Sequence, residues 1–196
     1  MTLSRKARVT TSPQEQEAAI LAAAATEFTD AGVRQANMDT IAKSAGVSRS
    51  TLYRRFPSKD NLLIALANVT FERGMTELED VIEGRTPREA VVEAFAHGAH
   101  MIATDPLLHR MVVDDTEIRT LTASMSGIFI DMVADRVSDS LRRAGATMPD
   151  DELRRAVEIH VRLVISYLEV PIADEAQRTP EAIRELAASF LAPMVY

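Results

Sequence analysis

The amino-acid sequence predicts an all-α fold of about nine helices, with a three-helix N-terminal domain and a larger C-terminal helical domain. Two observations support this class. Apolar residues recur at spacings of three and four along most of the chain, which is the period of an amphipathic helix. No segment alternates with the period of two that a half-buried strand requires. We therefore expect no β-sheet.

Prolines and glycines place the helix boundaries. A capping residue precedes a proline at four positions, where proline suits the first helical turn: Ser12-Pro13, Thr86-Pro87, Asp105-Pro106 and Thr179-Pro180. Glycines that suit helix ends are Gly32, Gly46, Gly84 and Gly145. The expected helices are residues 13–31, 38–45, 49–56, 59–83, 87–103, 106–114, 117–144, 150–169 and 180–191. We place the domain boundary between residues 1–58, which include a basic arm at 1–12, and residues 59–196.

Residues 38–56 (MDTIAKSAGVSRSTLYRRF) read as two short helices joined by a tight turn. Gly46 stands where the first helix must stop, because glycine takes a left-handed backbone without steric cost. Ser48 is a suitable N-cap for the second helix. Leu52 and Phe56 lie four residues apart, so they face the core together. This layout is typical of a helix-turn-helix that binds DNA.

Two runs of sequence resemble the N-terminal domain of TetR-type transcriptional regulators: ILAAAATEFTDAG (20–32) and DTIAKSAGVSRSTLYRRFPSKDNLL (39–63). The resemblance covers about the first third of the chain, and a multi-part pattern is more specific than a single glycine turn. Ser50 stands where the family often has Gly, and Arg55 where it often has Tyr or His. Both departures lie on the reading helix, so they bear on DNA sequence preference.

Polar side chains on the reading helix and beside it are suited to phosphates and base edges. We assign to DNA binding Thr40, Ser48, Arg49, Ser50, Thr51, Tyr53, Arg54 and Lys59. Arg49 is our candidate for a guanine contact, and Thr40 suits a phosphate near a helix N-terminus. By the resemblance, Tyr53 and Lys59 contact the sugar-phosphate backbone. A solvated polar face is the alternative.

The composition limits the chemistry. The chain contains no cysteine, which excludes disulfides, thiol catalysis and cysteine zinc sites. The net charge is −7, yet the first sixty residues hold nine basic and six acidic side chains, so the DNA-facing part carries a positive charge. The basic arm with Arg5, Lys6 and Arg8 suits a minor groove or phosphates, or else a disordered tail. No apolar run is long enough to predict a membrane partner, and cytoplasmic residence is expected.

Methionines and phenylalanines in the C-terminal domain suggest a ligand pocket, since methionine adapts to varied apolar shapes. The candidate lining is Phe71, Met75, Phe95, His97, Met101, Met111, Met125, Phe129 and Met132. Gly74, Gly98 and Gly127 fall inside expected helices, where each costs about 1 kcal/mol relative to alanine. Close helix approach or space for a ligand explains them. Ordinary core packing is the alternative for each single residue, whereas the TetR resemblance implies a small-molecule effector pocket in this domain.

No catalytic residue, metal ligand set or cofactor is expected. His97 and His100, with Glu93 one turn earlier, have a helical spacing that suits a metal, but a third ligand and supporting hydrogen bonds are needed. Histidines that pack in the core or line the pocket are the preferred interpretation. The sequence also lacks nucleophile and phosphate-loop motifs.

The last two helices carry more apolar surface than packing on one side requires. We assign a homodimer interface to Val157, Val161, Val164, Leu168, Ile183, Leu186 and Phe190. The TetR resemblance implies the same arrangement, and a thick monomer core is the alternative. A two-fold dimer also fits two half-sites of a pseudo-palindromic DNA operator.

These observations predict a one-component DNA-binding regulator, most simply a repressor released from double-stranded DNA by a small apolar or amphipathic effector. Two other classes are compatible with the residues. One is a helical ligand-binding or enzymatic protein with a vestigial DNA-binding head. The other is a non-specific architectural DNA binder, whose affinity falls steeply with salt.

Overall fold

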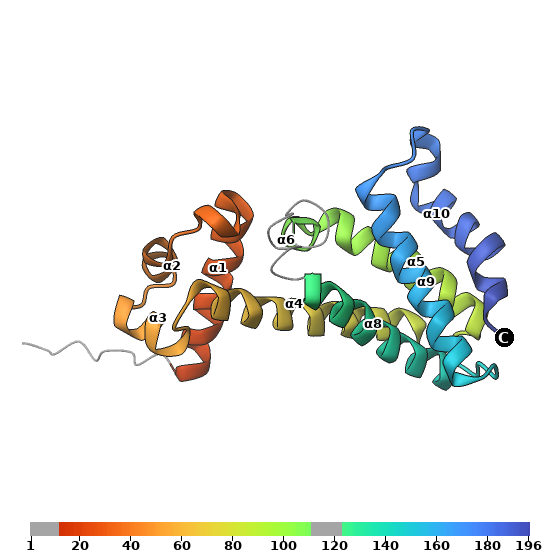
Figure 1. Cartoon of the computed structure of the whole chain (residues 1–196), viewed down its shortest axis with the longest axis horizontal. Coiled ribbons are helices and arrows are strands. Elements are labelled where there is room, and N and C mark those ends of the chain that lie inside the picture. Colours follow the sequence, from red (N-terminus) through yellow and green to blue (C-terminus); the bar gives the residue numbers. More distant parts are fainter. Residues whose placement is uncertain (1–11, 111–122) are drawn as a thin grey trace, which may run out of the picture. The chain divides into compact units, whose positions relative to one another are not determined.

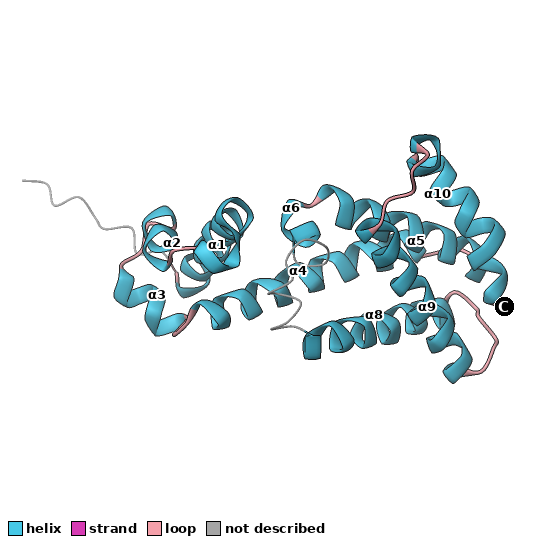
Figure 2. Ribbon diagram, turned by 45° about the horizontal axis from the view of Figure 1, so that its top comes forward, coloured by secondary structure: helices cyan, strands magenta, loops and turns pink. Residues whose placement is uncertain are grey.

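The computed structural model describes residues 12–110 and 123–196, and the side chains of all of these except 123–128. The described chain is helical and contains no strand, as the sequence predicts (Figures 1 and 2). The helices are α1 (Pro13–Gln35), α2 (Met38–Ser44), α3 (Arg49–Arg55), α4 (Lys59–Ile82), α5 (Pro87–Thr104), α6 (Pro106–His109), α8 (Ala123–Arg143), α9 (Asp150–Glu169) and α10 (Pro180–Leu186).

The chain divides into two compact units, Met1–Val69 and Thr70–Tyr196. The division falls inside α4, so the first turns of this helix belong to the first unit. The sequence-based boundary assigned all of α4 to the second unit. The observed boundary lies later than the expected one because the first turns of α4 contribute buried side chains, Leu62, Leu63 and Leu66.

The first unit is organised around one face of α1. Ile20, Ala24 and Phe28 succeed one another at intervals of four and are fully buried. Ile41 of α2 and Leu52 of α3 are also fully buried. These five side chains form the small core from which the exposed face of α3 is presented.

The turn between α2 and α3 forms as its residues predict. Gly46 has a φ of 67°, and its N–H donates to the carbonyl of Lys43 at 3.1 Å. The next N–H, of Val47, donates to the carbonyl of Ala42 at 3.0 Å. This pair of bonds closes the end of α2, and the Ser48 hydroxyl then accepts the N–H of Thr51 at 3.1 Å to begin α3.

Two helices begin with the predicted capping box. The backbone N–H of Ser12 donates to the Glu15 carboxylate at 2.6 Å, and the Ser12 hydroxyl accepts the Glu15 N–H. These bonds hold the pKa of Glu15 below its ordinary value. At α5 the hydroxyl and the backbone N–H of Thr86 donate to Glu89, and they lower the pKa of that carboxyl in the same way.

The second unit packs α5 against α8, α9 and α10. Ala90, Val91 and Phe95 supply the buried side of α5, and Leu141 of α8 and Leu153 of α9 are buried in the same cluster. The helix expected at 180–191 is regular only to Leu186, after which wider and tighter turns follow over Ala187–Leu191 and Ala192–Met194. Of the helices expected at 106–114 and 117–144, the parts within 111–122 lie outside the described residues.

Across residues 12–110 and 123–196, no helix has both the length and the apolar character that crossing a bilayer requires.

Replacement of Gly46 tests the turn of the first unit. A Cβ at this position meets no atom within 4 Å, so the cost of Gly46→Ala is the left-handed backbone itself, about 1 kcal/mol of unfolding free energy. Gly46→Asn should cost less, because asparagine tolerates this conformation. Urea titration measures both. Equal stability of the Gly, Asn and Ala proteins contradicts the assignment.

Candidate DNA-reading helix and ligand pocket

The reading helix α3 displays a polar face. Arg49, Ser50, Tyr53 and Arg54 are exposed, with 45% of the Tyr53 surface accessible. Thr51 is half-buried. A face of this kind offers donors to phosphates and base edges. Thr40, in the first turn of α2, is exposed as well.

Arg49 is already paired within the first unit. Its Nε and Nη2 groups contact the two carboxylate oxygens of Asp39, which lies in the first turn of α2. Both side chains are well exposed, and such pairs contribute about 0–1 kcal/mol. The pair is therefore weak, and its contribution to holding the Arg49 side chain in place is small.

Ser48 and Lys59, which the sequence assigns to DNA, also stabilise the ends of helices. Ser48 caps α3, and its hydroxyl also lies 2.9 Å from that of Ser50 and 2.8 Å from that of Thr51. The Lys59 ammonium donates hydrogen bonds to the backbone carbonyls of Val33 at 2.9 Å and Arg34 at 2.8 Å. Sequence reasoning missed this second role, in which Lys59 satisfies carbonyls near the end of α1.

Arg55 does not share the exposed face of α3. Its Nη1 donates to Glu17 of α1 at 2.8 Å, and only 20% of its side chain is accessible. The sequence analysis placed Arg55 on the reading helix with a bearing on DNA sequence preference. Its position one turn after Thr51, on the half-buried side, instead makes it a link between α3 and α1.

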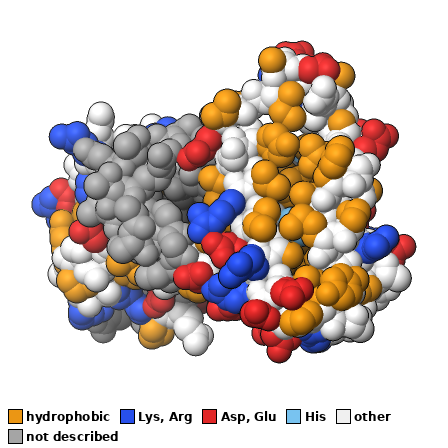
Figure 3. Space-filling view, turned by 45° about the vertical axis from the view of Figure 1, so that its right-hand side comes forward, with side chains coloured by type: hydrophobic (Ala, Val, Ile, Leu, Met, Phe, Trp, Pro, Cys, Tyr) orange, Lys and Arg blue, Asp and Glu red, His pale blue; other side chains and the backbone are white. Residues whose placement is uncertain are grey.

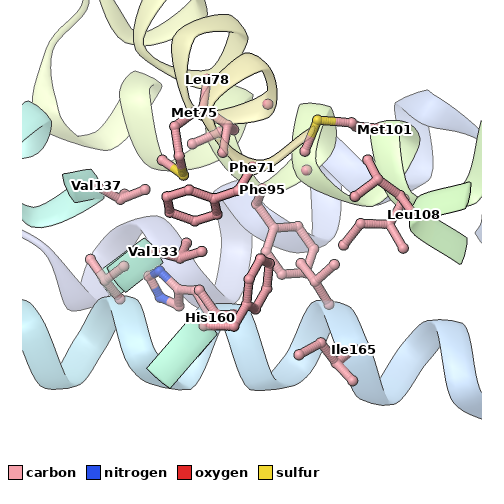
Figure 4. A pocket seen from close by; sticks show the side chains of 18 of the residues that line it. Phe71, Met75, Leu78, Phe95, Met101, Leu108, Val133, Val137, His160 and Ile165 are labelled. Carbon is pink, nitrogen blue, oxygen red and sulfur yellow. The ribbon is translucent and has the colours of Figure 1, made fainter. Parts of the chain in front are cut away.

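The second unit contains an apolar cavity of about 90 Å³. Side chains from α4, α5, α6, α8 and α9 line it (Figure 4). Five of the side chains proposed for the pocket are in its wall: Phe71, Met75, Phe95, Met101 and Phe129. The rings of Phe71 and Phe129 meet edge to face, with centroids 5.7 Å apart, an arrangement that aromatic pairs favour.

Four of the proposed pocket residues are not placed in this wall. Met132 is 40% exposed on α8, whereas the next residue, Val133, is buried and lines the cavity. His97 is absent from the lining, and its Nε2 lies 3.5 Å from a carboxylate oxygen of Glu77. Met111 and the side chain of Met125 lie outside the described residues.

Three valines assigned to the dimer interface line the cavity instead: Val157, Val161 and Val164. Val157 is only 2% exposed within a single chain. A side chain that is already buried, as Val157 and Val164 are, has no area left to bury in a dimer, so these two assignments are corrected, and the half-buried Val161 stays a prediction. Leu168, Ile183 and Leu186 are half-buried, and Phe190 is exposed.

His160 is the pocket residue that sequence reasoning missed. It lies on α9 between Val157 and Val164, is 7% exposed, and lines the cavity. Burial lowers its pKa to about 4, because the apolar surroundings disfavour the imidazolium. The signal was present in the sequence, since residues 157, 160 and 164 share one helical face.

The two glycines in the pocket wall differ. A Cβ on Gly74 would lie 2.9 Å from the sulfur of Met101, whereas a Cβ on Gly98 would meet nothing within 4 Å. Gly74 therefore permits the close approach of a side chain, and Gly98 borders open space. The sequence had left both explanations open for these positions.

The residues weighed as metal ligands have other neighbours. Glu93 lies 3.3 Å from Arg184, and His100 is exposed. No group of three or more potential ligands gathers in the part of the chain that the structure describes.

A helix-turn-helix unit followed by a helical unit with an apolar cavity defines a class of one-chain DNA-binding regulators, and the comparisons agree. Residues 20–66 match the model of bacterial regulatory proteins of the tetR family, and residues 87–189 match the tetracyclin repressor C-terminal domain. The chain belongs to the TetR family of bacterial transcriptional regulators.

Curated relatives support the same conclusion along most of the chain. An uncharacterized HTH-type transcriptional regulator of Mycobacterium tuberculosis is 31% identical over 180 residues, which is 90% of this chain and 83% of the relative. The regulator UidR of Escherichia coli is 27% identical over 163 residues, covering 80% of this chain and 81% of its own. The protein is therefore a DNA-binding transcriptional regulator.

Solved structures share the fold at lower identity. The TetR family repressor AlkX from Dietzia aligns with a TM-score of 0.63 and 23% identity, over 90% of this chain and 94% of its own. FadR from Bacillus subtilis, solved in complex with stearoyl-CoA, aligns with a TM-score of 0.62 and 19% identity, over 88% of this chain and 97% of its own.

The buried imidazole of His160 predicts a pH dependence of stability. The unfolded chain binds a proton at His160 below about pH 6.5, whereas the folded chain binds it only near pH 4. The contribution of the neutral imidazole to the free energy of unfolding is fully present above pH 6.5. It falls by up to about 1.4 kcal/mol per pH unit as the pH drops toward 4.

Urea titrations at several pH values measure this effect in the wild type and in His160→Leu, which should lack the histidine's share of the slope. His100→Leu, at an exposed histidine, is the matched control and should follow the wild type. Parallel curves for wild type and His160→Leu would show that the buried ring does not cause the slope.

Proposed function

We propose that this regulator is a repressor that leaves its operator when a small apolar molecule enters the cavity of the second unit. One observation carries the proposal: α4 contributes Phe71, Gly74, Met75 and Leu78 to the cavity wall, and the same continuous helix begins in the first unit. A ligand that alters the packing of α4 thereby acts on the helix that leads to the reading head.

Ion pairs hold the second part of α4 to its neighbours. Arg136 of α8 donates to Glu72 at 2.7 Å and to Glu79 at 3.0 Å, and these hydrogen bonds raise the pKa of Arg136. Arg73 lies 2.6 Å from Asp105, the N-cap of α6. These contacts give α4 a defined position for a ligand to change. Only a difference in ligand affinity between two positions produces a response, typically 1–3 kcal/mol.

DNA recognition is assigned to the exposed face of α3 and to the start of α2. In this proposal Arg49 exchanges its contact with Asp39 for a base edge, while Thr40 and Tyr53 contact the backbone of the duplex. Ser50, Thr51 and Arg54 complete the surface. Ser48 and Lys59 support it through the cap of α3 and the end of α1, and their remaining hydrogen-bonding capacity is directed to phosphates.

The dimer interface is assigned to apolar side chains that a single chain leaves exposed. Ile159 and Tyr167 are exposed on α9, Val170 is exposed directly after it, and Phe190 follows α10 with 72% of its surface accessible. Figure 3 shows apolar side chains gathered on the face of the second unit where these helices lie. Leu168, Ile183 and Leu186 lie half-buried in the same part of the chain. A two-fold interface buries such a surface.

No catalytic activity is assigned to the cavity. Among the described residues of its wall, His160 is the titratable one and Thr70 the other polar one, and no carboxylate joins them, whereas acid–base or nucleophilic catalysis needs paired groups. A regulator of chromosomal DNA also acts in the cytoplasm, where we place the protein.

Selection of binding sites from random duplex DNA tests the regulator and its reading face together. We expect the wild type to enrich a pseudo-palindrome at fixed salt, and Tyr53→Ala to lose or strongly weaken it. Tyr196→Ala removes an exposed tyrosine from the second unit and is the matched control. A folded wild-type dimer that enriches no sequence would instead favour the vestigial-head interpretation.

Charge placed on the exposed apolar face tests the dimer. Phe190→Glu and Val170→Glu should each convert a dimer into a monomer of 21.5 kDa, because an unpaired carboxylate is costly to bury. Sedimentation equilibrium measures the mass. Met132→Glu, at an exposed methionine of α8, should remain dimeric. Loss of the dimer in that control, or its survival in both variants, would move the interface elsewhere.

A further inference from the structure

The imidazole of His160 is a buried polar group without a partner. Its side chain is more than nine-tenths buried, and its Nε2 has no hydrogen-bond partner among the described residues. Figure 4 shows the ring extending from α9 among apolar side chains that include Met75 and Val133. A buried nitrogen left in this state typically destabilises a protein, so an occupant that bonds it is favoured.

The described part of the wall carries no charged side chain. Among residues 12–110 and 129–196, no lysine, arginine, aspartate or glutamate lines the cavity, and the hydroxyl residue Thr70 is the other polar member. Because burial lowers the pKa of His160 to about 4, its ring is neutral at physiological pH. An ionised ligand group would therefore be buried without a countercharge, which is strongly unfavourable.

The dimensions of the cavity limit the occupant. Its volume of about 90 Å³ is below the roughly 150 Å³ of a cavity that admits benzene. Two features allow it to widen to the size of one ring: the open space beside Gly98 and the flexible side chains of Met75 and Met101. The edge-to-face pair of Phe71 and Phe129 gives the wall aromatic surface that suits a flat body.

We propose that the cavity binds small uncharged molecules with an apolar body of about one ring and a single hydroxyl group, which hydrogen-bonds to Nε2 of His160. A hydroxyl both donates and accepts, so it matches either tautomer of the neutral imidazole. This inference rests on the proposed function for the role of the ligand, but the binding itself is independent of DNA.

Three one-ring probes, phenol, toluene and benzoate, separate the contribution of the hydroxyl group from that of the apolar body and from the effect of a charge. Isothermal titration calorimetry with the full chain at neutral pH should give phenol an affinity about tenfold above that of toluene, the value of one neutral hydrogen bond. Benzoate, which is ionised, should show no binding. In His160→Leu the preference of phenol over toluene should disappear. Met132→Leu, an exposed substitution outside the wall, should leave all three results unchanged.

A second readout does not require a variant. Phenol should shift the imidazole proton resonances of buried His160 and leave those of exposed His100 in place. His160→Gln retains a hydrogen-bonding group and should keep part of the phenol preference, so it serves if His160→Leu fails to fold.

Several results would overturn the inference: no binding of phenol, toluene bound as tightly as phenol by the wild type, benzoate bound most tightly, or a phenol preference that survives His160→Leu. The site selection described above distinguishes the two failures. If the protein selects a pseudo-palindrome but does not bind phenol, only this ligand class is refuted. If it binds phenol but enriches no operator, the proposed function is refuted and the ligand class is retained.

Discussion

The backbone hydrogen bonds of α4 continue through Lys59–Ile82, and the organisation of both units depends on this one helix. Its first turns bury Leu62 and Leu66 in the unit that carries the reading helix, and its later turns bury Met75 and Leu78 in the unit that holds the cavity. A continuous helix resists bending because each turn is bonded to the next. The proposed response to a ligand depends on this continuity.

The cavity reflects a balance between stability and binding. Filling it with larger side chains would stabilise the second unit, since buried apolar contact favours folding. The chain instead places Gly98 beside open space, and the described residues offer the Nε2 of His160 no hydrogen-bond partner. Each of these features costs stability. Their presence together in one wall is expected of a site that a ligand completes.

The reading surface is held in place by weak local contacts. Asp39 pairs with Arg49, and Ser48 caps the helix on which Arg49 lies. Exposed pairs and caps of this kind are worth about 1 kcal/mol or less each, and the rigid core beneath them fixes the helix itself. The unit therefore presents polar groups whose present contacts are weak enough to be exchanged for the DNA contacts proposed above.

Local chemistry allowed the sequence alone to determine the helices, their caps and the turn at Gly46, because these depend on residues within four positions of one another. The methionine and phenylalanine content of the C-terminal domain also identified Phe71 and Phe95 as pocket residues. Only the tertiary structure decided which face of α9 meets the cavity, and so moved Val157 from the interface to the wall. It likewise revealed the buried environment of His160. Both depend on side chains of other helices, whose positions are set by packing over long sequence separations and not by local periodicity.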